Sequence, residues 1–185
     1  VVVTDVGQHQ MVTSRYYKYK NPRTNITSGG AGTMGFALPA ALGAKIAAPH
    51  QQVIAIIGDG GYQMTIQELG TIMEYEIPVK IMVLNNNFLG MVRQWQQLFH
   101  GKRYSFTEMR NPDFIKIAEA YNIRANKVTE QKNLKAALEE MLESPTSYFL
   151  EVVVEKEDNV FPMVPAGAGV AEVILEIPTG EKKQG

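Results

Sequence analysis

The chain passes from an apolar run at residues 53–57 (VIAII) directly into Gly58-Asp59-Gly60-Gly61. A short run of β-branched residues is typical of a parallel strand that is covered on both faces. Ligands bind beyond the carboxyl ends of such strands, where glycine lets the backbone approach a phosphate. An aspartate there would repel a phosphate unless a cation lay between them, and Mg²⁺ prefers oxygen ligands. The stretch therefore predicts a parallel sheet with a magnesium and phosphate site at its edge.

A second polar turn follows the next strand along the chain. The apolar run at residues 79–84 ends in Asn85-Asn86-Asn87, and 27 residues separate Asp59 from Asn86. That spacing fits one helix and one strand, and a right-handed crossover brings Asn86 to the same sheet edge as Asp59. A glycine-rich turn alone is as easily structural as functional, whereas the pair at this spacing favours a shared site. A dinucleotide site is a weaker alternative, because GDGGYQ lacks the third glycine of that motif.

Further strands and helices alternate along the chain. Apolar runs predict strands at residues 1–6 and 148–154, with a short one at 126–128. Helical spacing of apolar residues predicts helices over residues 65–75, 114–121 and 130–143, and Asn111-Pro112 is interpreted as the cap of the second. This alternation indicates an α/β fold, a doubly wound and mainly parallel sheet with helices on both faces. We expect one domain at residues 1–179 and a flexible tail at 180–185.

Composition excludes several classes of partner. The net charge of −1 over 185 residues gives no reason to expect nucleic acid or an anionic membrane as a partner. The longest apolar runs are too short to span a bilayer. The chain has no cysteine, which excludes disulfides and thiolate metal sites and fits a reducing compartment. We expect a cytoplasmic protein of bacterial type, and interpret the chain as the last third of a longer polypeptide.

The two polar turns resemble a known signature. Gly58-Asp59-Gly60 followed by Asn85-Asn86 resembles the motif of thiamine-diphosphate enzymes. The resemblance implies that Asp59, Asn86 and the main-chain carbonyl of Phe88 hold Mg²⁺. It also implies that the amides of Gly60 and Gly61 bind the diphosphate, within the thiamine-diphosphate-binding fold.

Flanking segments resemble one family of these enzymes, the acetohydroxyacid synthases. Residues 27–36 (TSGGAGTMGF) are similar to the loop around the aminopyrimidine, where the carbonyl of Gly32 would accept a hydrogen bond and Met34 would hold the cofactor bent. Residues 6–11 are similar to the segment that closes over the diphosphate, which implies contacts from Val6, Gly7, Gln8 and His9. Cofactor contacts are also expected after the second turn, from Leu89, Gly90 and Met91.

The run at residues 90–97 (GMVRQWQQ) is the most discriminating part of the resemblance. Related decarboxylases and glyoxylate carboligases share the metal motif but not this run. By this likeness Trp95, with Met91 and Val92, shapes the pocket for the second 2-ketoacid. An isolated tryptophan is more often a core residue, whereas an aromatic wall can favour one extra methylene by ~1–3 kcal/mol.

Two features remain open to two interpretations, and a third departs from the family pattern. His9 is as easily an acid/base group as a loop histidine bonded to the backbone. Many family members carry tryptophan where this chain has Val12, a difference expected to change packing rather than the reaction. The coil from Phe161-Pro162 either packs across the sheet or covers the active site.

The resemblance implies the cofactor-binding domain of a catalytic subunit. That enzyme condenses two pyruvates, or pyruvate and 2-ketobutyrate, with loss of carbon dioxide in branched-chain amino-acid biosynthesis. The expected cofactors are thiamine diphosphate and Mg²⁺, with FAD in the central domain of the full-length enzyme. The activating glutamate lies in an N-terminal pyrimidine domain of the neighbouring subunit, so Glu68 is not assigned that role.

Expectations about assembly follow from the same likeness. The resemblance implies a homodimer or homotetramer and leaves room for a regulatory small subunit. Because the pyrimidine and central domains are not expected within this chain, the chain alone is expected to be inactive. Another thiamine-diphosphate carboligase or decarboxylase, such as a glyoxylate carboligase, is the alternative enzyme. A folded fragment that binds little is the non-catalytic alternative.

Overall fold

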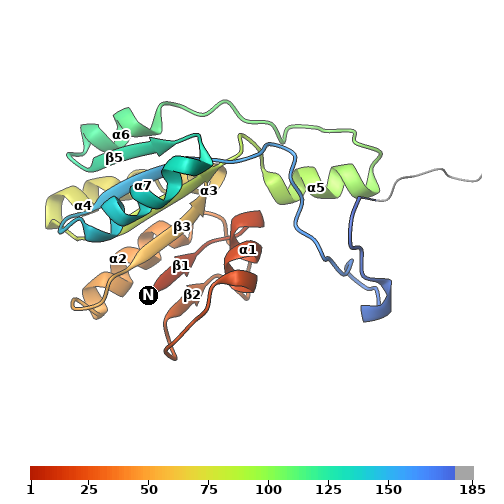
Figure 1. Cartoon of the computed structure of the whole chain (residues 1–185), viewed down its shortest axis with the longest axis horizontal. Helices are drawn as coiled ribbons and strands as arrows, with labels where there is room; N and C mark the ends of the chain where they lie inside the picture. The colour runs from red at the N-terminus through yellow and green to blue at the C-terminus, as the bar shows by residue number, and fades with distance from the viewer. Residues whose placement is uncertain (178–185) are drawn as a thin grey trace, which may run out of the picture.

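One parallel sheet forms the centre of the molecule in the computed structural model, which describes residues 1–177 (Figure 1). Within these residues the sheet has six strands in the lateral order β2-β1-β3-β4-β6-β5, and every pairing is parallel. The strands are β1 (Val2–Thr4), β2 (Asn25–Thr27), β3 (Ile54–Gly58), β4 (Lys80–Asn85), β5 (Arg124–Val128) and β6 (Tyr148–Val153). The expected tail at 180–185 lies outside the described residues.

Helices connect the strands and cover both faces of the sheet. They are α1 (Gln8–Tyr16), α2 (Ala37–Ala47), α3 (Asp59–Met64), α4 (Glu68–Tyr75), α5 (Gly90–Phe99), α6 (Phe114–Ala120) and α7 (Gln131–Glu143), with a 3₁₀ turn at Val170–Glu172. The helix expected over residues 65–75 begins at Glu68, and a separate helix starts earlier, at Asp59 itself. No helix of the described part is long and apolar enough to cross a membrane.

Alternate strand residues pack into two apolar layers, as a sheet covered on both sides requires. Ile57 and Val83 join a buried cluster with residues of α2, α4 and α6. Leu84 and Leu150 face the opposite way and pack with Met141 of α7. The predicted doubly wound α/β fold is therefore confirmed.

The chain changes direction across the sheet at β1, and this creates the site. From β1 the chain crosses to β2 on one side, then returns to β3 on the other side of β1. Loops at such a switch point diverge and leave a crevice beyond the carboxyl ends of the strands. The β3–β4 register pairs Gly58 with Leu84. Asp59 and Asn85 therefore leave the sheet at the same level, and Asn86 follows one residue beyond.

Besides α3, four helices and strands of the structure were not predicted from the sequence: α1, α2, α5 and β2. The edge strand β2 has only three residues and no run of apolar side chains. In α5 the usual pattern is reversed, because Arg93, Gln94 and Gln97 are buried while Trp95 and Phe99 are largely exposed. A search for an apolar stripe facing a core misses such a helix.

The expected cap at Asn111-Pro112 is wrong. Asp113 is the N-cap of α6, and its carboxylate accepts a hydrogen bond from the Lys116 backbone N–H at 3.2 Å. This leaves the Asn111 side chain free for other contacts, described below.

Candidate cofactor site

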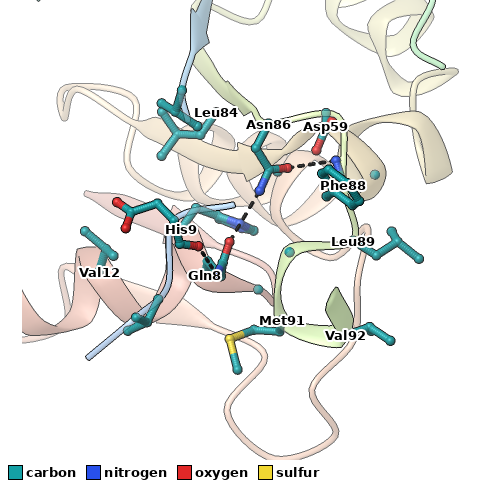
Figure 2. A pocket seen from close by; sticks show the side chains of 18 of the residues that line it. Gln8, His9, Val12, Asp59, Leu84, Asn86, Phe88, Leu89, Met91 and Val92 are labelled. Carbon is teal, nitrogen blue, oxygen red and sulfur yellow. Dashed lines mark hydrogen bonds between the residues drawn. The ribbon is translucent and has the colours of Figure 1, made fainter. Parts of the chain in front are cut away.

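A cavity of about 310 Å³ lies at the carboxyl ends of β1, β3 and β4. Figure 2 shows Asp59, Asn86 and Phe88 on one side of it, with Gln8 and His9 facing them from α1. The residues expected at the site that line the cavity are Val6, Gly7, Gln8, His9, Met34, Gly58, Asp59, Gly60, Gly61, Asn86, Phe88, Leu89, Gly90, Met91 and Val92.

Two expected residues do not line this cavity. Gly32 is exposed, in a left-handed conformation (φ 64°) that favours glycine. Trp95 lies one helical turn beyond Met91 and borders a second, open hollow on the surface. Val92 lines both this hollow and the main cavity. Its indole is 38% exposed and packs against Phe99, with ring centroids 4.7 Å apart. The structure thus brings Met91 and Val92 to the cavity and places Trp95 on its outer flank.

Asp59 is a buried carboxylate at the first residue of α3, with 2% of its surface exposed. Its Oδ2 accepts a hydrogen bond from Asn111 Nδ2 at 2.7 Å. Burial raises the pKa of the Asp59 carboxyl above its ordinary value, and hydrogen bonds from Asn111 and the backbone of Gly60 and Asn87 act against this rise. Among the described residues no lysine or arginine forms an ion pair with Asp59. A buried charge without a partner is costly, which is the usual situation of a metal ligand before the metal binds.

Asn86 is held in one orientation by two neighbours. Its Oδ1 accepts from the Phe88 backbone N–H at 3.0 Å, and its Nδ2 donates to Gln8 Oε1 at 3.3 Å (Figure 2). The amide oxygen retains a second lone pair for a cation. The Asn87 backbone N–H of the same turn donates to the Asp59 carboxylate, so this turn lies beside Asp59.

Glycines let the walls of the cavity approach each other closely. A Cβ on Gly58 would come within 3.0 Å of the His9 ring, and one on Gly60 within 2.8 Å of Leu89 Cδ2. A Cβ on Gly90 would overlap Gln8 Oε1. These close contacts, rather than unusual backbone angles, explain why glycine stands at these three positions.

His9 belongs to a buried cluster around Asp5. Its Nε2 donates to Asp5 Oδ1 at 2.5 Å, because a carboxylate can only accept. Asp5 Oδ2 accepts from the Gly35 backbone N–H at 3.1 Å. One carboxylate therefore fixes both the histidine at the cavity and the loop that carries Met34. The sequence offered a signal for Asp5, since it directly follows the first strand.

The cavity wall, as far as the structure describes it, contains no lysine or arginine side chain. Within the described residues its ionisable groups are His9 and the carboxylates of Asp59, Glu155 and Asp158. A diphosphate could not bind these walls by ion pairs with lysine or arginine. It would need backbone N–H donors together with a divalent cation.

Helix α5 and the chain after β6 close the outer side of the cavity. Gln8 Nε2 donates to Gln94 Oε1 at 3.0 Å and to the Asp158 carbonyl at 2.9 Å. Gln94 Oε1 accepts from the Val160 backbone N–H at 2.9 Å, and Arg93 donates to the Asp158 carbonyl at 2.6 Å. Figure 1 shows α5 lying apart from the sheet, beside this segment. The buried polar side chains of α5, Arg93 and Gln94, thus bind the chain segment after β6 through hydrogen bonds.

Sequence reasoning missed part of the lining. The additional residues are Val12, Leu84, Val154, Glu155, Asp158, Asn159 and Val160. Most of them follow the carboxyl end of β6. That end lies at the same sheet edge as the ends of β3 and β4, so the position of the strand was the available signal.

Comparison with known proteins agrees with this geometry. Residues 5–152 match the model of the thiamine pyrophosphate (thiamine diphosphate) enzyme, C-terminal TPP binding domain. The chain is 48% identical over 178 residues to the acetolactate synthase isozyme 2 large subunit of Escherichia coli K12, covering 96% of this chain and 32% of that protein. It is 47% identical over 181 residues to the mitochondrial acetolactate synthase catalytic subunit of Aspergillus candidus, covering 98% of this chain and 26% of that protein.

An archaeal relative shows the same extent of similarity. The chain is 44% identical over 178 residues to a probable acetolactate synthase large subunit of Methanocaldococcus jannaschii, covering 96% of this chain and 30% of that protein. The chain spans between a quarter and a third of the length of these three relatives. The family match covers the ends of β1, β3 and β4, where the cavity lies. The chain therefore belongs to the thiamine pyrophosphate enzymes, as a C-terminal cofactor-binding domain of that family.

Proposed function

We propose that this chain is the magnesium and thiamine-diphosphate binding domain of an acetolactate synthase. The observation that carries the proposal is the buried Asp59 carboxylate beside Asn86, in a cavity whose described wall has no lysine or arginine. The whole enzyme would condense two pyruvates, or pyruvate and 2-ketobutyrate, with loss of carbon dioxide. The relatives support this reaction, since two of them are named as acetolactate synthases and the third as a probable one.

The side chains fit a hard divalent cation. The donors would be the Asp59 carboxylate, the Asn86 amide oxygen and the Phe88 carbonyl, and diphosphate oxygens would complete the shell. Mg²⁺ prefers such a set, with few protein ligands and substrate phosphates beside them. The cation would also compensate the buried charge of Asp59, which has no ion-pair partner in the described structure.

Other residues of the cavity would position the cofactor. The backbone amides of Gly60 and Gly61, at the start of α3, are proposed to bind the diphosphate. Gly32 is proposed to accept from the aminopyrimidine and Met34 to support its bent form. When bound, thiamine diphosphate supplies the carbanion chemistry, and the protein supplies orientation and electrostatics. Met91 and Val92 would exclude water and border the ketoacid.

The rest of the enzyme enters as proposals of the same kind. FAD would bind in a central domain, and the activating glutamate would come from a pyrimidine domain of a neighbouring subunit in a homodimer or homotetramer. Two relatives are named as large subunits, which supports a regulatory small subunit as partner. We propose a bacterial-type cytoplasm as the compartment, since one relative is bacterial. The chain alone should form no acetolactate, which a colorimetric assay of the purified chain with pyruvate would check.

Competition between acceptors tests the proposed activity. In the full-length enzyme, 2-ketobutyrate should outcompete pyruvate as acceptor by about 10- to 200-fold, the range that one methylene against an apolar wall allows. Trp95→Leu should remove most of this preference and leave turnover with pyruvate in place. The product ratio is measured with both ketoacids present.

Phe99→Leu is the matched control, because Phe99 packs on Trp95 and lies on the same helix but does not border the hollow shared with Val92. It should keep the preference. Equal product ratios in the wild-type enzyme would instead favour another thiamine-diphosphate carboligase or decarboxylase. A preference that survives Trp95→Leu would remove Trp95 from the acceptor pocket.

A further inference from the structure

The side chain of Asn111 contacts Asp59 of the proposed metal site but does not line the cavity. Its Nδ2 is 2.7 Å from Asp59 Oδ2, 2.9 Å from Asn85 Oδ1 and 3.2 Å from Asn87 Oδ1. Its Oδ1 accepts from Gln63 Nε2 at 2.8 Å. No other side chain among the described residues donates to Asp59. Asn111 therefore joins the two polar turns without being part of the cavity wall.

A buried glutamate, Glu151, is linked to Asn111 by hydrogen bonds through Asn85, and it fixes the orientation of both side-chain amides. Glu151 of β6 is 2% exposed, and its Oε1 is 3.0 Å from Lys127 Nζ and 2.7 Å from Asn85 Nδ2. Because a carboxylate can only accept, Asn85 must direct its NH₂ group toward Glu151 and its Oδ1 toward Asn111. Asn111 must then present its own NH₂ group, which also faces Asp59. The chemistry of Glu151 thus determines that a donor meets the Asp59 carboxylate.

We propose that Asn111 is a positioning residue for the cation, oriented by Glu151 through Asn85. It engages Oδ2 of Asp59 and leaves Oδ1 without a side-chain partner, available to a divalent cation. The proposal rests on the proposed function, since it assigns a role toward the metal of that site. Outer-shell partners of this kind keep a ligating carboxylate in one rotamer, and their loss typically weakens metal binding about 10- to 100-fold.

The dependence of cofactor binding on Mg²⁺ tests this role. Thiamine diphosphate is titrated into the chain by calorimetry at a series of Mg²⁺ concentrations. Asn111→Ala should raise the half-saturating Mg²⁺ concentration about 10- to 100-fold. Saturating Mg²⁺ should restore the affinity for thiamine diphosphate, because the cavity wall itself is unchanged. A change that only damaged the fold would lower the affinity at every Mg²⁺ concentration.

Asn133→Ala is the matched control, because Asn133 is exposed on α7 and its side chain forms no hydrogen bond in the described structure. It should leave the Mg²⁺ requirement unchanged, and thermal unfolding of the free variants reports folding separately. An Asn111→Ala chain with the wild-type Mg²⁺ requirement, or with weak binding that excess Mg²⁺ does not restore, would overturn the positioning role alone. A wild-type full-length enzyme that binds no thiamine diphosphate with Mg²⁺ would overturn the proposed function as well.

A double-mutant cycle tests the orienting chain and provides a second variant. Asn85→Ala should also raise the Mg²⁺ requirement, because it frees the Asn111 amide to rotate. If Asn85 acts through Asn111, the double variant should need no more Mg²⁺ than Asn111→Ala alone. Fold-changes that multiply in the double variant would show that Asn85 does not act through Asn111, and would overturn that step.

Discussion

Replacing Asp59 by asparagine should abolish the stabilisation that Mg²⁺ and thiamine diphosphate give the chain, while the free chain becomes at least as stable as wild type. The two effects have opposite signs because one carboxylate causes both. Asp59 is 2% exposed and has no ion-pair partner in the described structure. Without a cation its charge is a cost, and with a cation it is the principal ligand.

The pH dependence of the free chain follows from the same group. Burial raises the pKa of the Asp59 carboxyl above its ordinary value. The folded chain therefore binds this proton more tightly than the unfolded chain does. Stability falls as the pH rises from the ordinary pKa through the raised one. Asp59→Asn carries no such titration, so its advantage over wild type should grow across that window and persist at neutral pH.

Thermal unfolding with and without ligand measures both effects. A ligand at 100 times its dissociation constant stabilises a fold by about 2.7 kcal/mol. For a domain of this size that corresponds to a rise of roughly 5–10 °C in the unfolding midpoint. The wild-type chain should show this rise only when Mg²⁺ and thiamine diphosphate are both present. Asp59→Asn should show none at the same concentrations.

Glu139→Gln is the control of equal charge change, on the exposed face of α7. It should keep the full ligand-induced rise. A rise of wild-type size in Asp59→Asn would show that the cation does not depend on this carboxylate. A free Asp59→Asn chain that unfolds well below wild type would contradict the cost assigned to the buried charge.

The sequence was sufficient to predict β3 and β4, which are consecutive in the chain, and the residues of the site that directly follow them. The apolar runs of β3 and β4 are continuous because both faces of these strands are covered. Parallel strands end at one edge, so the sequence separation of Asp59 and Asn86 was enough to place them together. Gly60 and Gly61, which directly follow Asp59, line the same cavity for the same reason.

The unpredicted part depends on contacts between segments far apart in the chain. Asn111 is a plausible helix cap by its local sequence, and only the packing of three loops brings it to Asp59. Helix α5 buries Arg93 and Gln94 because the chain after β6 supplies carbonyl partners for them. Neither arrangement leaves a periodic signal. Trp95 shows the same limit, since its run of sequence (residues 90–97) was recognisable by resemblance but its exposed position was not.

The second large effect is expected at Gly61, where an added methyl group should strongly destabilise the fold. A Cβ on Gly61 would overlap Asp5 Oδ2 and lie 3.5 Å from the Gly35 backbone nitrogen. Asp5 is fully buried and holds both His9 Nε2 and the Gly35 N–H. Its carboxylate cannot move without losing one of these hydrogen bonds. Gly61→Ala should therefore loosen β1, α3 and the loop of Met34 together.

Overpacking of this kind costs about 1–3 kcal/mol, and a lost hydrogen bond to a buried carboxylate adds about 1–3 kcal/mol. We expect Gly61→Ala to lower the free energy of unfolding by about 2–6 kcal/mol, measured by urea denaturation. Gly43→Ala is the matched control, because Gly43 is an exposed residue of α2 and no neighbouring side chain or other segment lies within 4 Å of its Cβ position. There the same change should stabilise the chain by about 0.5–1 kcal/mol.

Asp5 itself provides the test of the cause. If the clash with its carboxylate is responsible, Gly61→Ala should cost far less in a chain that already carries Asp5→Ala, because the overlapping atoms are gone. The two changes would then be strongly non-additive, as expected for residues in direct contact. Additive losses would mean that Gly61 is needed for another reason, such as the start of α3. The comparison separates two reasons for glycine at position 61: the steric clash with Asp5 Oδ2 and the geometry of α3. Only the steric clash disappears when the Asp5 side chain is removed.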